Sequence, residues 1–413
     1  MAWSAAHLLS APHRLGFFAG AVAMAASALW WAALLLAMTA GLAPPPWTVP
    51  PPQAHGLAFT FAYMPLFITG FLFTAGPRWL GQRGPPAREL LAPVLAMSAG
   101  WCLAVIGFHA DERLAAAGVA LAGVGWGTVG WRFAAMLRAS RESDRVHARV
   151  VTAAAVIGLA ALVLAAAGLA AGQGPLVRAA TLVALWGFLA PVFATVSQRM
   201  LPVFDAVTPP SLTARSPFGL LGATLFALAC TAAGEAAQAL WWPLPAAAHA
   251  ALAAVQAGAA VLLLWLAWRW ARLQNLRNRL LAMLFGGFVW LGIAFSLAAL
   301  SHARVAAFGE PASLGLAPLH ALAAGYLGTT LFAMATRVAA GHAGRPVAAD
   351  DVAWLLYWLA QAAALLRVAS ALAPASAPVL LPLAAFAWAA AGTGWALRYG
   401  RWLGSKASEA RRP

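Results

Sequence analysis

Charged residues are scarce in this chain. Asp, Glu, Lys and Arg make up 9% of the 413 residues, and only one of the basic residues, Lys406, is a lysine. A soluble domain has about 25% charged residues. Hydrophobic residues reach 63%, with a mean hydropathy of +0.79. The composition therefore excludes a water-soluble globular protein and predicts an all-α integral membrane protein with many spans.

Other absences exclude whole classes of chemistry. The two cysteines, Cys102 and Cys230, lie in apolar segments and form no CxxC pair, which argues against a disulfide framework or a structural zinc site. The chain has no Walker loop, no dinucleotide-binding glycine motif in a βαβ context and no HExxH. Acidic residues are too few and too peripheral to predict a proton relay, since Glu235 is the only one near a membrane interior.

Apolar runs of membrane length recur along the whole sequence. Breaks between them carry turn residues such as Pro44-Pro45-Pro46 and Gly84-Pro85-Pro86. We predict one polytopic membrane domain over residues 1–413. Its twelve expected spans are 15–41, 56–76, 89–109, 114–136, 150–171, 178–202, 217–240, 246–270, 280–301, 317–339, 352–372 and 376–398.

The basic residues predict an orientation for these spans. Placing the N-terminus and every second loop on one side puts 22 of the 26 Lys and Arg residues there. The other side keeps only Arg113, Arg178, Arg304 and Arg367. Loops rich in Lys and Arg face the cytoplasm, so both termini are expected to be cytoplasmic. The net charge of +15 is explained by these loops and does not indicate a nucleic-acid partner.

Histidines gather at the expected outer ends of the spans. Five of the nine lie there, namely His55, His109, His249, His302 and His320. Histidine-bound haem or copper needs imidazoles from different helices in one bundle. His55, His320, His302 and His109 are therefore candidate metal ligands. The alternative for each is a histidine that simply sits at the membrane interface.

The expected span 317–339 and its C-terminal flank carry several ionisable residues. His320 and His342 are 22 residues apart, about 33 Å along a helix, so they belong at opposite membrane faces. His342, Arg337 and Arg345, together with Arg199 from another span, form a candidate cytoplasmic site for an anionic group such as the haem propionates. The alternative is that the arginines only anchor helix ends.

This segment resembles the signature of the NnrS family. The matching residues are His320-Ala321-Leu322, Gly328-Thr329, Met334-Ala335-Thr336-Arg337-Val338, Gly341-His342 and Gly344-Arg345-Pro346. Two further stretches are similar to family motifs: Ala54-His55 with Gly70-Phe71-Leu72, Thr74, Pro77 and Trp79, and the run Arg199-Met200-Leu201-Pro202-Val203-Phe204.

The resemblance implies a bacterial inner-membrane protein that contains haem and copper and acts in nitric oxide metabolism and nitrosative-stress defence. It also implies an unidentified electron donor. One motif departs from the family: where the family has WHAHE, this chain has Pro52, Gln53, Ala54, His55 and Gly56. Only the second histidine of that motif remains, which bears on whether copper binds.

Two rival functions stay open at this level. One is a cofactor-free permease for a small molecule, which proline-interrupted spans such as the one with Pro65 would suit. The other is a protein that handles or senses haem or copper without catalysis. Under the favoured interpretation, His55 and His320 are metal ligands, His342 belongs to another site, and Arg337 and Arg345 balance propionates.

Overall fold

The computed structural model describes residues 3–43, 45–204, 217–240 and 243–406, with side chains for nearly all of them. Every regular element in these residues is helical. The described chain forms two compact units, each built from separate stretches of sequence. Unit 1 contains residues 1–184, 335–347 and 389–413, and unit 2 contains residues 185–334 and 348–388.

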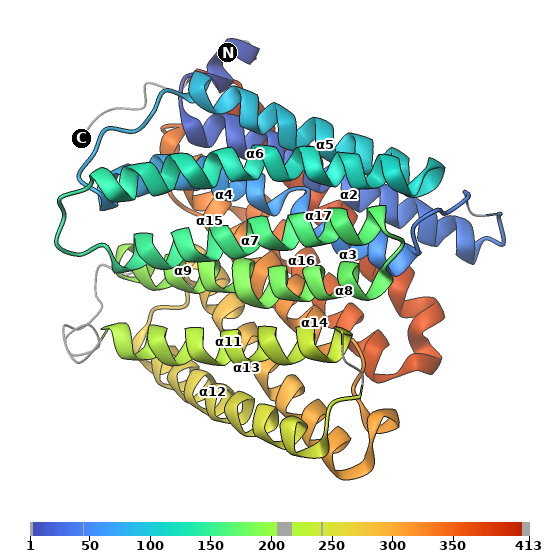
Figure 1. The fold of residues 1–413 in the computed structure, drawn as a ribbon. Helices are drawn as coiled ribbons and strands as arrows, with labels where there is room; N and C mark the ends of the chain where they lie inside the picture. Colours follow the sequence, from blue (N-terminus) through green and yellow to red (C-terminus); the bar gives the residue numbers. More distant parts are fainter. Residues whose placement is uncertain (1–2, 44, 205–216, 241–242, 407–413) are drawn as a thin grey trace. The chain divides into compact units, whose positions relative to one another are not determined.

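Unit 1 is a bundle of long helices that lie side by side (Figure 1). Its elements are α1 (Ala5–Leu8), α2 (Pro12–Thr39), α3 (Pro51–Phe61), α4 (Met64–Trp79), η1 (Ala87–Leu90), α5 (Leu91–Ala110), α6 (Glu112–Ala139), α7 (Val146–Ala170), α8 (Gly174–Val183), and the C-terminal parts of α15 (Thr329–His342) and α17 (Ala377–Leu403).

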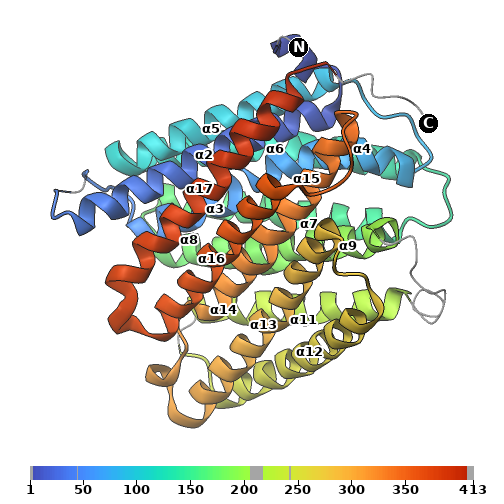
Figure 2. The same ribbon diagram turned by 180° about the vertical axis from the view of Figure 1, so that it is seen from behind.

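Unit 2 contains the remaining helices, several of which are seen from behind in Figure 2. They are η2 (Ala184–Leu189), α9 (Ala190–Phe204), α11 (Pro217–Leu240), α12 (Ala246–Leu273), α13 (Arg279–Phe308), η3 (Glu310–Ala312), α14 (Ala317–His320), η4 (Ala321–Gly328), the first part of α15, α16 (Asp351–Leu372), η5 (Pro374–Ser376) and the first part of α17.

Eleven helices in the described residues are long and apolar enough to cross a membrane. They correspond to all the expected spans except 317–339. That segment is also helical and consists of α14, η4 and α15 in succession. Its polar residues lower its hydropathy, and it is not among the eleven helices. The all-α membrane architecture expected from composition is confirmed.

Glycine sets the closest helix contacts in unit 1. A Cβ on Gly16 of α2 would lie 2.5 Å from the backbone nitrogen of Gly70 on α4. A Cβ on Gly118 of α6 would lie 2.4 Å from the backbone nitrogen of Ala104 on α5. Small residues of this kind let helix backbones approach closely, and in a bilayer such packing replaces the hydrophobic effect between helices.

The break in the second expected span falls where proline predicts it. Helix α3 ends at Phe61 and α4 begins at Met64, with Pro65 in its first turn. Proline cannot donate a backbone hydrogen bond to the preceding turn. The carbonyl oxygen of Pro65 accepts a hydrogen bond from the Thr69 hydroxyl at 2.7 Å.

The first and last helices of unit 1 meet at one end. The backbone N–H of Ser4 donates to the carbonyl of Gly404, and the Arg14 guanidinium donates to the carbonyls of Leu403 and Ser405 at 2.9 and 2.6 Å. Arg14 thereby caps the C-terminus of α17, where a cation is favoured by the helix dipole. The N-terminal helix α1 and the end of α17 therefore lie at the same end of unit 1.

Candidate functional site

The structure brings together two histidines of unit 1 that are distant in sequence. The rings of His13, in the first turn of α2, and His342, at the end of α15, stack with centroids 4.0 Å apart and planes 30° apart. His13 is 4% exposed, and among the described residues neither of its ring nitrogens has a hydrogen-bond partner. An unsatisfied buried polar group costs about 1–3 kcal/mol, so a bound group that satisfied this ring would be stabilised there.

Cationic side chains surround this histidine pair. Arg14 and Arg78 both act electrostatically on His342. Arg345, three residues beyond His342, lies over the Trp402 ring at 4.4 Å. This end of unit 1 therefore combines buried imidazole with positive charge. That combination suits a group that carries both a metal and negative charge.

Sequence reasoning identified His342 but not His13. No motif singles out His13, and 329 positions separate the two residues. The sequence could have related the two histidines only through the predicted membrane topology, because both fall on the side that the arginine count assigns to the cytoplasm. Of the other residues expected at this site, Arg337 also belongs to unit 1, whereas Arg199 belongs to unit 2.

His320 lies in unit 2 and is the last residue of α14, directly before the π-helical segment η4 begins. Its Nδ1 is 2.9 Å from the carbonyl oxygen of Leu316. Because a carbonyl only accepts, Nδ1 carries the proton and Nε2 keeps the lone pair. A backbone carbonyl on the other ring nitrogen is the usual support of a histidine metal ligand. π-helical segments also occur frequently at functional sites.

His55 in unit 1 is held between aromatic rings. Its ring stacks on Trp31 with centroids 4.3 Å apart and planes 28° apart, and packs against Phe59 at 4.3 Å with planes tilted by 43°. These contacts orient the imidazole. His55 and His320 belong to different units, and their role as metal ligands stays a prediction.

His109 is fully engaged by its neighbours in unit 1. Its Nε2 accepts a hydrogen bond from the Trp30 indole at 3.1 Å, and its Nδ1 lies 3.0 Å from the carbonyl oxygen of Pro46. One nitrogen accepts and the other donates, so both positions of the neutral ring are used. This geometry assigns His109 to joining α2, α5 and the Pro46 loop, and we leave it out of the proposed ligand set.

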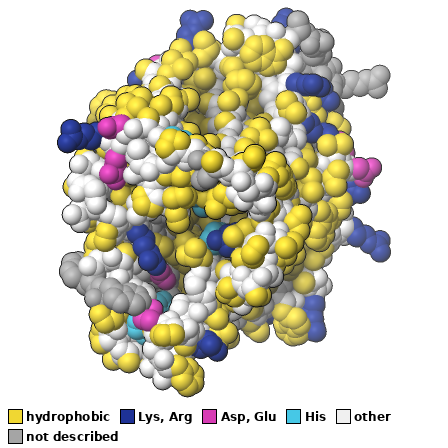
Figure 3. Space-filling view, turned by 90° about the vertical axis from the view of Figure 1, so that its right-hand side faces the viewer, with side chains coloured by type: hydrophobic (Ala, Val, Ile, Leu, Met, Phe, Trp, Pro, Cys, Tyr) yellow, Lys and Arg dark blue, Asp and Glu magenta, His cyan; other side chains and the backbone are white. Residues whose placement is uncertain are grey.

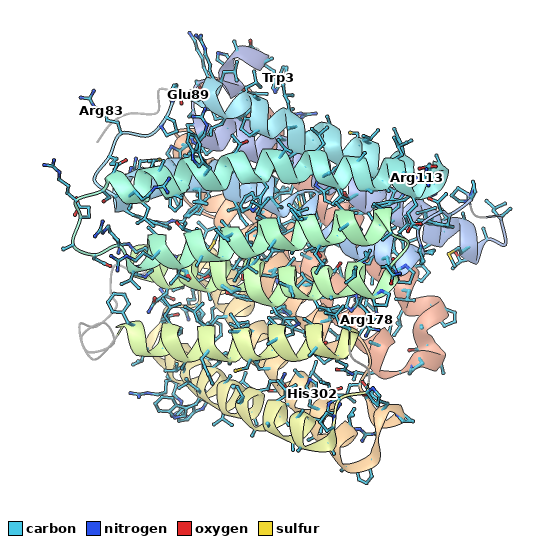
Figure 4. All side chains as sticks on the ribbon, in the orientation of Figure 1. Trp3, Arg83, Glu89, Arg113, Arg178 and His302 are labelled. Atoms are coloured by element: carbon cyan, nitrogen blue, oxygen red, sulfur yellow. The ribbon has the colours of Figure 1, made fainter. Side chains whose placement is uncertain are left out.

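His302 is paired with another histidine in unit 2. Its Nδ1 lies 2.8 Å from Nδ1 of His249, and both rings are buried. Figure 4 labels His302 near the end of α13. Among the residues that the structure describes, no three or more His, Cys, Asp or Glu side chains are arranged to hold a metal ion.

The haem that the resemblance implies needs one or two protein ligands for its iron and cationic groups near its propionates. His13 and His342, with Arg14 and Arg78 acting on His342, are residues of these kinds.

The helices and side chains together define a multi-pass all-α membrane protein with buried imidazoles in each unit. Figure 3 views the molecule toward the ends of the helices, and on this face basic, acidic and histidine side chains are interspersed among hydrophobic ones. The family model described as NnrS protein matches residues 7–406, so the chain belongs to the NnrS family. At the family level this supports a haem and copper protein related to nitric oxide. None of the curated proteins matches the chain.

Proposed function

We propose that this protein is a haem-binding protein of the bacterial inner membrane that acts in nitric oxide metabolism or nitrosative-stress defence. The observation that carries the proposal is the stacked His13–His342 pair, in which the buried ring nitrogens of His13 have no hydrogen-bond partner in the part of the chain that the structure describes. One ring of this pair would hold the haem iron. Arg337 and Arg345 would balance the propionates at the same end of unit 1.

His320 is the second imidazole prepared for a metal. Its Nδ1–H is fixed by Leu316, so Nε2 is the nitrogen that would coordinate. His55 is held by Trp31 and Phe59 and remains a candidate ligand in unit 1. Copper would need ligands beyond these, and the reduced motif around His55 supplies only one of the two histidines of the family motif.

When bound, ferrous haem supplies an iron that takes up nitric oxide. The protein's own contribution is to keep the His13 ring buried and to place the cationic Arg14 and Arg78 near the His342 ring. Nitric oxide is a small apolar gas that partitions into the bilayer, so it would reach such a site from the lipid.

The test is a reduced-minus-oxidised visible spectrum of purified protein, with iron and copper analysis. We expect a Soret band in the wild type and its loss or shift in His13→Ala and His342→Ala. His320→Ala and His55→Ala test the other candidate ligands in the same way. The matched controls are His7→Ala, a histidine at the same end of unit 1, and His109→Gln, whose nitrogens are already used.

A colourless, metal-free wild type after haem-replete expression would overturn the cofactor proposal and favour a permease. An unchanged Soret band in both His13→Ala and His342→Ala would move the haem away from this pair. Consumption of nitric oxide by the reduced protein with an artificial donor would indicate an enzyme. Binding without consumption would indicate a sensor or a haem-handling protein.

A further inference from the structure

The C-terminal end of α12 in unit 2 carries two tryptophan–arginine pairs on its surface. The guanidinium carbon of Arg269 lies 4.8 Å from the centre of the Trp265 ring, and that of Arg272 lies 3.8 Å from the centre of the Trp268 ring. The partners in each pair are four residues apart, so they are neighbours on one helix. Both contacts are cation–π interactions, which attract each guanidinium to the face of its ring.

The two rings lie outside the core of unit 2. Trp265 and Trp268 are 47% and 53% exposed, and the arginines paired with them are exposed as well. Trp270, in the same turn of the helix, packs instead on Phe288 of α13 with ring centroids 4.8 Å apart. The contact with Phe288 holds this end of α12 against α13, and the two pairs remain on the surface.

The charge of these two arginines is not balanced by acidic side chains. Residues 236–309, which include all of α12 and α13, contain no Asp or Glu. The next ion pair along the described chain joins Arg279 to Asp351 at 2.7 Å, and neither Arg269 nor Arg272 takes part in an ion pair within the described residues. The end of α12 therefore presents positive charge that is available to an anion.

An exposed apolar face leads along α12 to the same place. Val261, one turn before Trp265, is 71% exposed, and Leu273 at the end of the helix is exposed too. The most apolar part of α12 is 22% buried, the smallest share among the eleven membrane-length helices of the described residues. Apolar surface for acyl chains and cationic groups for a headgroup therefore adjoin each other on one helix.

We propose that this end of α12 binds an anionic phospholipid, with the phosphate between the two guanidinium groups and the acyl chains along the exposed apolar face. A guanidinium that stacks on a ring keeps its N–H edge free, and such an edge donates to phosphate oxygens in a bidentate manner. A free phosphate ion would use the charge alone, whereas a phospholipid also covers the apolar surface. The arginine distribution assigns this end of α12 to the cytoplasmic leaflet, whose surface is negative.

The pairing distinguishes this site from a general interface anchor. Tryptophans and arginines occur at the ends of many spans, where they need only lie at the right depth. In a phospholipid site the ring also holds the guanidinium in position. Removal of the rings should therefore weaken headgroup binding although the net charge of the protein is unchanged. The proposal involves none of the histidines and does not depend on haem.

The experiment is native mass spectrometry of the full-length protein in detergent, titrated separately with phosphatidylglycerol and phosphatidylcholine. We expect one phosphatidylglycerol to bind about tenfold or more tightly than phosphatidylcholine, because each arginine near the surface favours an anionic headgroup. The double variant Arg269→Gln/Arg272→Gln should lose this preference. The double variant Trp265→Leu/Trp268→Leu keeps both charges and should weaken phosphatidylglycerol binding about threefold or more. Arg138→Gln, at an exposed position in the last turn of α6 on the same expected side, is the control that should change nothing.

Three results would overturn the proposal. The first is an unchanged preference for phosphatidylglycerol in the double arginine variant. The second is full phosphatidylglycerol binding in the double tryptophan variant, because the arginines would then act only as general anchors. The third is displacement of the lipid by millimolar inorganic phosphate, which would indicate an ion site. All four substituted side chains are exposed, so the variants should fold, and equal unfolding midpoints in lipid-free detergent check this.

Discussion

At the scale of single residues, unit 2 contains a buried chain of polar side chains. The Trp290 indole donates to Oε1 of Gln361 at 2.7 Å, the Gln361 amide donates to the Tyr357 hydroxyl at 2.6 Å, and that hydroxyl donates to the carbonyl of Met283 at 3.2 Å. The network joins two helices, α13 and α16. In a low-dielectric interior such a network is stabilising only while every member is satisfied.

We expect Gln361→Leu to destabilise the protein. Leucine has no amide, so it can neither accept from the Trp290 indole nor donate to the Tyr357 hydroxyl. The Trp290 N–H is then left buried without an acceptor, which costs about 1–3 kcal/mol. Thermal unfolding in detergent would show a lower midpoint than wild type. Thr128→Val is the control, because that exposed hydroxyl only bonds to its own helix at the Val124 carbonyl and its loss should cost less than about 0.5 kcal/mol. Equal midpoints for Gln361→Leu and wild type would show that the network contributes nothing.

Single residues also show where prediction from sequence reaches its limit. His320 was found from sequence because an ionisable residue in an apolar span is unusual. His13 was not found, because a histidine beside a span end is unremarkable until its neighbour is known. The role of His109 was also open, and only its contacts with Trp30 and Pro46 show that both nitrogens are used.

At the scale of elements, the contact between α2 and α4 depends on glycine. Gly16 of α2 lies against the backbone of Gly70 and Leu66 on α4, so any side chain there meets backbone atoms that cannot rotate away. Gly258 on α12 has no atom within 4 Å of an added Cβ. The two glycines therefore predict opposite outcomes for the same substitution.

Gly16→Ala should destabilise the protein by about 1–3 kcal/mol, because the helices must move apart to accept the methyl group. Gly258→Ala should be neutral or stabilising by up to about 1 kcal/mol, because alanine favours the helix and meets nothing. Unfolding midpoints of the two variants, measured side by side, check both. A Gly16→Ala variant as stable as Gly258→Ala would contradict the close α2–α4 contact.

The π-helical segments are the elements that sequence did not reveal. The expected span 317–339 reads as an ordinary apolar helix, yet residues 321–328 form η4 and residues 184–189 form η2. Gly325 of η4 lies against the Trp290 ring, with 2.5 Å between an added Cβ and the nearest ring atom. A π turn is a local response to packing between helices, so hydropathy carries no sign of it.

At the scale of the whole molecule, the arginine distribution predicts that both termini face the cytoplasm. A fluorescent protein fused after residue 413 should therefore fluoresce, and a phosphatase at the same point should be inactive. Fusions after Ala312, in the link between the ninth and tenth expected spans, should give the reverse. The same reporter result at both points would contradict the predicted orientation.

The sequence by itself determined the class of protein. Lipid cannot hydrogen-bond a backbone, so twenty-residue apolar runs must form helices, and their number and predicted orientation can be read from hydropathy and arginine. The tertiary structure decided which side chains meet: His13 with His342, His249 with His302, and Glu310 with a helix it does not belong to. Those contacts depend on how helices distant in sequence pack and where their turns tighten or widen, and composition and periodicity do not encode that packing.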